Sequence, residues 1–174
     1  MLMADVFSIA LSIIGFLVSL QGLWLLSRAL WPMRVGESAH RCRGRLWLLF
    51  LAGLPITFLM VVAAVGLSKI GGGQAFSFLV IALWFIWANI GVAGLATHIG
   101  QRLPSPVDRD RPWKATLRGG VALELAYVVP IVGWVGLMPI SWVIGAGAAT
   151  MSLLRRKDRQ PLPSPQSQPE VAAA

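Results

Sequence analysis

Glu124 is the only ionisable residue inside the long apolar stretches of this sequence, so it is the first candidate for chemistry. A charged side chain is costly inside a membrane, and such residues are by default candidates for function. A carboxylate at this position could bind a proton or a cation. Alternatively, Glu124 lies near the membrane surface and is held by Arg118, which is six residues away, about 9 Å along a helix. We favour this second interpretation and keep Glu124 as an ion-binding candidate.

His40, Cys42 and His98 are the residues that could hold a metal ion. Imidazole and thiolate groups suit zinc, and three protein ligands are sufficient for an open site. The His40-x-Cys42 spacing is not one of the usual zinc patterns, and the arginines around it repel a cation. The sequence also lacks a phosphate-binding glycine loop, a nucleophile elbow and an HExxH motif. We therefore expect no metal site, no cofactor and no catalytic residue.

The composition indicates what kind of protein must position these residues. Of the 174 residues, 56% are hydrophobic and 13% are charged, which is about half the charged fraction of a soluble domain. A soluble protein of this size still exposes about a third of the surface of its unfolded chain, so it could not hide this much hydrocarbon. The composition therefore indicates an integral membrane protein and excludes a soluble enzyme. The single cysteine excludes an internal disulfide framework.

Three segments have the length and composition of transmembrane helices. Residues 6–27, 46–68 and 75–97 contain no charge, and each is long enough to cross a hydrocarbon core of about 30 Å. Because the residues before the first segment lack the basic start of a signal peptide, we expect that segment to be retained.

The segment 119–154 has a different pattern. As one straight helix it would measure about 54 Å, which is too long for one crossing and short for two. Pro130, Gly133 and Pro139 offer breaks and divide it into 119–137 and 139–154. We predict an all-α polytopic transmembrane helical bundle with three full spans and a Pro/Gly-broken two-pass or hairpin segment. A disordered, basic and Pro-rich cytoplasmic tail, residues 155–174, is predicted to follow this domain, residues 1–154.

The basic residues predict the orientation of these spans. With the N-terminus outside and an even number of crossings in 119–154, 14 of the 15 Lys and Arg residues fall on the cytoplasmic side. With the N-terminus inside, only one of these Lys and Arg residues would fall on the cytoplasmic side. Since cytoplasmic loops carry the excess of Lys and Arg, we predict an outside N-terminus and a cytoplasmic C-terminus.

Small residues recur on one face of several predicted spans, where they would allow close helix packing. The first span carries five of them at spacings of four, three, four and three. We predict that these faces pack helices within the chain or in a homo-oligomer. The predicted packing residues are Ser8, Ser12, Gly15, Ser19, Gly22, Asn89, Ser141, Gly145 and Ala149.

Residues 118–148 carry the pattern Pro130-x-x-Gly133-Trp134, followed by Gly145-x-Gly147-Ala148. This stretch resembles a segment of uncharacterised small multi-pass bacterial membrane proteins. The resemblance implies the bacterial inner membrane as the location and implies no activity.

These observations predict a non-catalytic structural, scaffolding or accessory subunit. The alternative is a small transporter or channel component that uses Glu124 as its proton or cation site. The expected partners are a bilayer with anionic headgroups, which attract the basic loops, and further copies or a larger membrane complex. No nucleic acid is expected, because no folded basic domain is present to bind one.

Overall fold

The computed structural model describes residues 2–103, 111, 113–129 and 131–154, and this part of the chain contains helices and no strand. The prediction of an all-α protein is therefore confirmed. The predicted tail, residues 155–174, lies outside the described residues. The elements are α1 (Leu2–Leu30), α2 (Pro32–Cys42), α3 (Leu46–Ser68), α4 (Gln74–Gln101), α5 (Trp113–Val128), a π-helix (Val132–Leu137) and α6 (Met138–Leu154).

Four helical segments of the described chain are long and apolar enough to cross a membrane. They are Met3–Leu30, Leu46–Ser68, Gln74–Gln101 and Val132–Leu154, with mean hydropathies between 1.6 and 2.6. The first three include the predicted spans 6–27, 46–68 and 75–97. This finding supports the membrane class of the protein, while insertion and the number of spans stay predictions.

The segment 119–154 does not divide between the predicted pieces 119–137 and 139–154. Helix α5 ends at Val128, and the next helical stretch continues from the π-helix Val132–Leu137 into α6. Pro139 therefore lies inside a continuous helical stretch. The π-helix before Pro139 has i→i+5 hydrogen bonds in place of the i→i+4 bonds of an α-helix. The α-helical bonding pattern is therefore already interrupted just before this proline. Gly133, another predicted break, lies inside the π-helix, and Pro130, the third, lies outside the described residues.

A short helix, α2, occupies most of the region that the sequence analysis treated as a loop. Pro32 is its first residue, where a missing amide hydrogen removes no intrahelical bond. Val35, Ala39 and Cys42 follow at helical spacing, and all three are buried. The helix is thus amphipathic and packs its apolar face against the rest of the protein.

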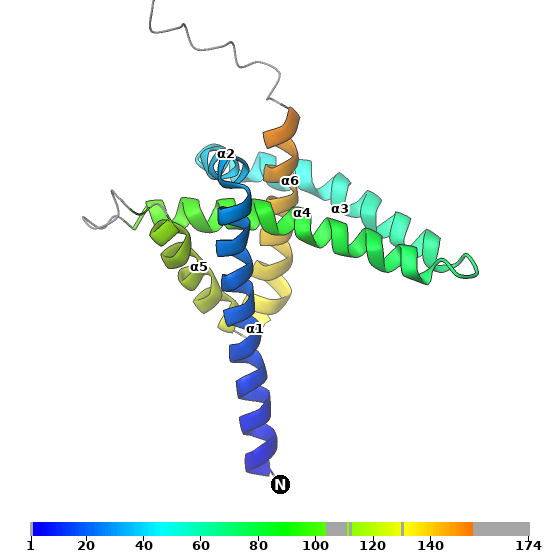
Figure 1. The fold of residues 1–174 in the computed structure, drawn as a ribbon, viewed down its shortest axis with the longest axis horizontal. Coiled ribbons are helices and arrows are strands. Elements are labelled where there is room, and N and C mark those ends of the chain that lie inside the picture. Colours follow the sequence, from blue (N-terminus) through cyan, green and yellow to red (C-terminus); the bar gives the residue numbers. More distant parts are fainter. Residues whose placement is uncertain (1, 104–110, 112, 130, 155–174) are drawn as a thin grey trace, which may run out of the picture.

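Helix α4 forms the centre of the fold and contacts α1, α2, α3, α5 and α6. Figure 1 shows α3 and α4 side by side and extending to one side of the molecule, while α1 and α6 run across them. The tight turn between α3 and α4 includes Gly72 with φ of +81°, a conformation that favours glycine. The N-terminal half of α1 projects away from the other helices (Figure 1).

The helices approach most closely at glycine residues. A Cβ atom on Gly91 of α4 would overlap the backbone of Gly145 in α6, and one on Gly53 of α3 would overlap the Val143 carbonyl group of α6. On the other side of α4, a Cβ on Gly100 would overlap the Ala115 carbonyl group of α5. These close backbone approaches fix the positions of α3, α5 and α6 around α4, as small residues do in membrane helix pairs.

Candidate functional site

One cluster of buried polar side chains lies between α1, α4, α5 and α6. Trp24 of α1 is completely buried, and its Nε1 donates a hydrogen bond of 3.2 Å to Oδ1 of Asn89 in α4. Asn89 in turn donates from Nδ2 to the Phe85 carbonyl oxygen at 2.8 Å. Asn89, predicted as a packing residue, therefore joins α1 to α4 through its side chain.

Tyr127 of α5 lies next to this pair and joins two further helices. Its ring packs edge-on against Trp24, with the ring centroids 6.5 Å apart. The Tyr127 hydroxyl is hydrogen-bonded to Oγ of Ser141 in α6, and Ser141 donates to the Met138 carbonyl oxygen at 2.8 Å. These interactions connect α5 and α6 in the buried interior.

Glu124 lies on α5 facing α1, near Gln21. Gln21 is 9% exposed, and its Nε2 donates to the Leu117 carbonyl oxygen at 3.0 Å. Its Oε1 lies over Gly120, one helical turn before Glu124. Within the described residues, Oε1 of Gln21 and Oε1 of Glu124 are buried and have no hydrogen-bond partner. Two acceptor oxygens on neighbouring helices thus lack a donor.

The five predicted packing residues of α1 are all exposed: Ser8, Ser12, Gly15, Ser19 and Gly22. A Cβ on Gly15 or Gly22 would have no described atom within 4 Å. The hydroxyl groups of Ser12 and Ser19 bond to carbonyl oxygens four residues earlier in the same helix. The described chain therefore places no other helix against this face.

The predicted packing residues of α6 have the opposite environment. Ser141, Gly145 and Ala149 are buried, and Gly145 faces Ala88 and Val92 of α4. The small residues of α6 therefore line its crossing with α4.

His40, Cys42 and His98 are not gathered into one site. His40 is exposed, while Cys42 and His98 are buried. Among the described residues, no three His, Cys, Asp or Glu side chains are placed to hold a metal ion. Burial raises the pKa of the Cys42 thiol to about 12, which disfavours the thiolate that metal binding requires.

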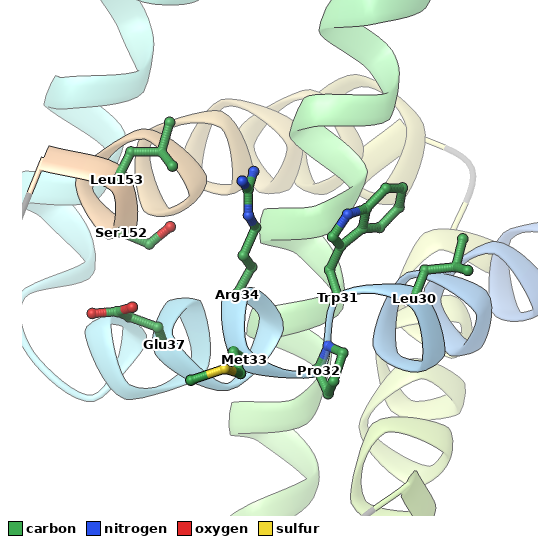
Figure 2. A pocket seen from close by; sticks show the side chains of 8 residues that line it. All are labelled: Leu30, Trp31, Pro32, Met33, Arg34, Glu37, Ser152 and Leu153. Carbon is green, nitrogen blue, oxygen red and sulfur yellow. The ribbon is translucent and has the colours of Figure 1, made fainter. Parts of the chain in front are cut away.

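A cavity of about 540 Å³ lies where α1 ends, α2 begins and α6 ends. Figure 2 shows Arg34 and Trp31 extending in the same direction from the start of α2, with Ser152 and Leu153 of α6 near Glu37. The Arg34 guanidinium group lies 5.9 Å from the centroid of the Trp87 ring in α4, a favourable cation–π geometry. Glu124 does not line this cavity.

Trp24, Tyr127 and the cavity were not among the residues and features predicted from the sequence. One signal for Trp24 was available, because a buried indole needs an acceptor for its N–H group and Asn89 is a rare amide in the apolar segments. The cavity had no such signal, since it forms where α6 lies beside the junction of α1 and α2, which is far from α6 in the sequence.

The interior polar pairs can therefore hold helices together, and the junction of α1, α2 and α6 offers a cavity with charged lining groups. Comparison of the chain with protein-family models, curated proteins and solved structures finds no match in any of the three.

Proposed function

We propose that this protein is a non-catalytic integral membrane protein that acts as a structural, scaffolding or accessory subunit. The observation that carries this proposal is that polar side chains of the interior form hydrogen bonds between helices. Trp24 pairs with Asn89, Thr97 with Thr116, Trp87 with Thr150, and Tyr127 with Ser141. Each pair joins two different helices, so these groups stabilise the packing of the bundle.

The proposed location is the bacterial inner membrane, with the N-terminus outside and the C-terminus in the cytoplasm. The distribution of Lys and Arg supports this orientation. A reporter that is active only in the cytoplasm, fused after Ala174, should be active. An inactive fusion of normal abundance would contradict the orientation, and a reporter active only outside the cytoplasm provides the matched control.

The proposed partners are anionic lipid headgroups and further copies or other membrane subunits. The exposed small-residue face of α1 supports association with another helix, because such faces allow close backbone approach. The test is purification of the tagged full chain from native membranes in a mild detergent. A stoichiometric partner or a stable oligomer is expected, and recovery of monomers alone would contradict the proposal.

A second candidate function is a small transporter or channel component that uses Glu124. The observation that favours it is the buried Oε1 of Glu124, which has no hydrogen-bond partner in the described chain; Oε1 of Gln21, which lies over Gly120 of the same helix, also has none. A proton or a cation would satisfy these acceptors.

Glu124→Gln separates the two functions because it removes the charge and keeps the shape. An accessory subunit should retain its partners and its thermal stability, since the new amide can donate to Gln21. A carrier reconstituted into vesicles should lose proton- or cation-dependent flux. Asp5→Asn, a change in the first turn of α1, is the control variant. Flux in the wild type that only Glu124→Gln abolishes would overturn the accessory role.

A further inference from the structure

The cavity between α1, α2 and α6 lies at the end of two candidate membrane spans. These spans are Met3–Leu30 and Val132–Leu154. The cavity is lined by Leu30, the last residue of the first span, and by Leu153, the last residue but one of the second. If these segments cross the bilayer, their shared end lies in the headgroup layer. Trp31 is part of the lining, and tryptophan is enriched at that level of a membrane protein.

One part of the cavity is suited to an anion. Pro32, Met33 and Arg34 line it, and they form the first turn of α2. No side chain caps this turn, and the first amides of a helix lack intrahelical acceptors and carry a partial positive charge. The Arg34 guanidinium group reaches into the same space (Figure 2). A guanidinium group beside a helix N-terminus is a favourable environment for a phosphate group.

The next turn of α2 carries the opposite charge. Glu37, three residues after Arg34, also lines the cavity, and residues at this spacing are neighbours on a helix surface. A carboxylate has two oxygens and about four acceptor positions, so it can accept from an ammonium group beside any other partner. Ser152 lies near Glu37 (Figure 2).

The rest of the lining is apolar and comes from Leu30, Trp31, Met33 and Leu153. These side chains suit the glycerol and upper acyl region of a lipid. The cavity therefore combines a cationic and an anionic group on the first two turns of α2 with an apolar wall to which α1 and α6 contribute.

We propose that this cavity binds a phosphatidylethanolamine headgroup, with the phosphate at Arg34 and the start of α2 and the ammonium at Glu37. The proposal rests on the proposed membrane location. A choline headgroup carries a cation but cannot donate hydrogen bonds to Glu37, and a glycerol headgroup carries no cation. Of these three headgroups, phosphatidylethanolamine alone combines a phosphate with a cation that donates hydrogen bonds.

The test uses the purified, delipidated full chain in detergent and native mass spectrometry. The probes are dioleoyl phosphatidylethanolamine, phosphatidylcholine and phosphatidylglycerol, which share their acyl chains. The wild type should bind one phosphatidylethanolamine in preference to the other two lipids. Arg34→Ala should weaken that binding about tenfold or more, as expected for the loss of a charge-assisted hydrogen bond. Glu37→Gln should remove the preference for ethanolamine over choline.

Arg45→Ala is the matched control, because Arg45 is exposed and does not line this cavity. Arg34→Lys, which keeps the charge, should bind better than Arg34→Ala, and tryptophan fluorescence shows whether each variant is folded. Equal binding of the three lipids, or unchanged binding by folded Arg34→Ala, overturns the proposal. Binding that appears only after deletion of residues 155–174 also overturns it, since the tail would then be the occupant. Fractionation of the chain with membranes tests the proposed function separately.

Discussion

Gly91→Ala is expected to destabilise the protein strongly, although it adds a single methyl group and exchanges a poor helix former for the best one. Gly91 lies where α4 crosses α6. A Cβ atom at this position would lie 2.7 Å from the α-carbon of Gly145 and closer still to its carbonyl group, whereas ordinary van der Waals separations begin at 3.4 Å. The obstructing atoms belong to the backbone, so no side chain can rotate to relieve the overlap.

The size of the effect follows from the displacement that the methyl group requires. The Cβ atom would lie 1.9 Å from the carbonyl oxygen of Gly145, so relieving that overlap requires α6 to retreat by about 1.5 Å, and tightly packed interiors resist such shifts at a cost of about 1–3 kcal/mol. The same retreat would stretch the hydrogen bond between Trp87 Nε1 and Thr150 Oγ1 from 3.1 Å to about 4.6 Å, beyond a normal bond. Loss of this bond adds about 1 kcal/mol.

The expected total is therefore about 2–4 kcal/mol, which for a chain of this size lowers Tm by about 4–16 °C. The assay is thermal unfolding of the purified full chain in detergent, followed by tryptophan fluorescence. Gly66→Ala in α3 is the matched control, because a Cβ there meets no described atom within 4 Å. This control should be as stable as the wild type or slightly more stable. If Gly91→Ala unfolds at the wild-type temperature, α4 and α6 do not cross at this glycine.

Two further perturbations test the interior of the bundle. Trp24→Phe keeps an aromatic ring against Tyr127 but removes the donor to Asn89. It should lower the free energy of unfolding by about 1–2 kcal/mol. In a double-mutant cycle with Asn89→Ala, strictly additive effects would show that the two side chains do not interact. Cys42 should resist maleimide in the folded protein, because it is 2% exposed and its pKa, raised by burial from 9.0 to about 12, reduces the thiolate fraction at pH 8 about 1,000-fold. The control is Cys42→Ala with His40→Cys, whose exposed thiol should react quickly, and equal rates for the two proteins would contradict the burial of Cys42. The raised pKa also means that the unfolded chain loses this proton first, so the free energy of unfolding should fall as the pH rises above about 9 in the wild type and not in Cys42→Ala.

The apolar segments of the sequence predicted the long helices well, because length and lack of charge are local properties. The predicted residues 46–68 coincide with α3. The amphipathic helix α2 could also have been found, since Pro32, Val35, Ala39 and Cys42 follow the pattern of a helix start and a buried face. Basic residues around these positions suggested a loop, but Arg34 and Arg41 lie half-buried on α2, and Arg43 and Arg45 follow its end.

The partners of each helix could not be predicted in the same way. In a soluble helix, the apolar face identifies the side that packs against the core. In α4, residues Ala88 to Thr97 are almost uniformly apolar or small and are all buried, whereas the equally apolar start of α1 is exposed. A helix that faces lipid and a helix that faces protein have similar compositions, so hydrophobicity does not distinguish α1 from α4.

Small residues are informative only when their partners are known. Gly145 and the small-residue face of α1 were both predicted from the sequence to pack against another helix. Gly145 does pack on α4, whereas the small-residue face of α1 meets no described helix. The two cases differ in whether a facing helix presents a small residue at the point of contact. Gly145 meets Gly91, a second glycine on the facing helix, whereas no described helix presents a matching glycine to Gly15 or Gly22.

The positions of the glycines in α4 explain why this helix is the centre of the fold. Gly91 and Gly100 are nine residues apart, which is about two and a half turns, so they lie on opposite faces of the helix. Gly91 receives α6, and Gly100 receives α5. Gly94, about 60° around the helix from Gly91, receives Ser38 of α2. Three helices thus approach the backbone of α4 from different sides, and the C-terminal half of α4 has little surface left for an external partner. If this protein binds other subunits through helix packing, the interface must therefore use surfaces that α4 does not cover, and the exposed N-terminal half of α1, with small residues on one face, is such a surface.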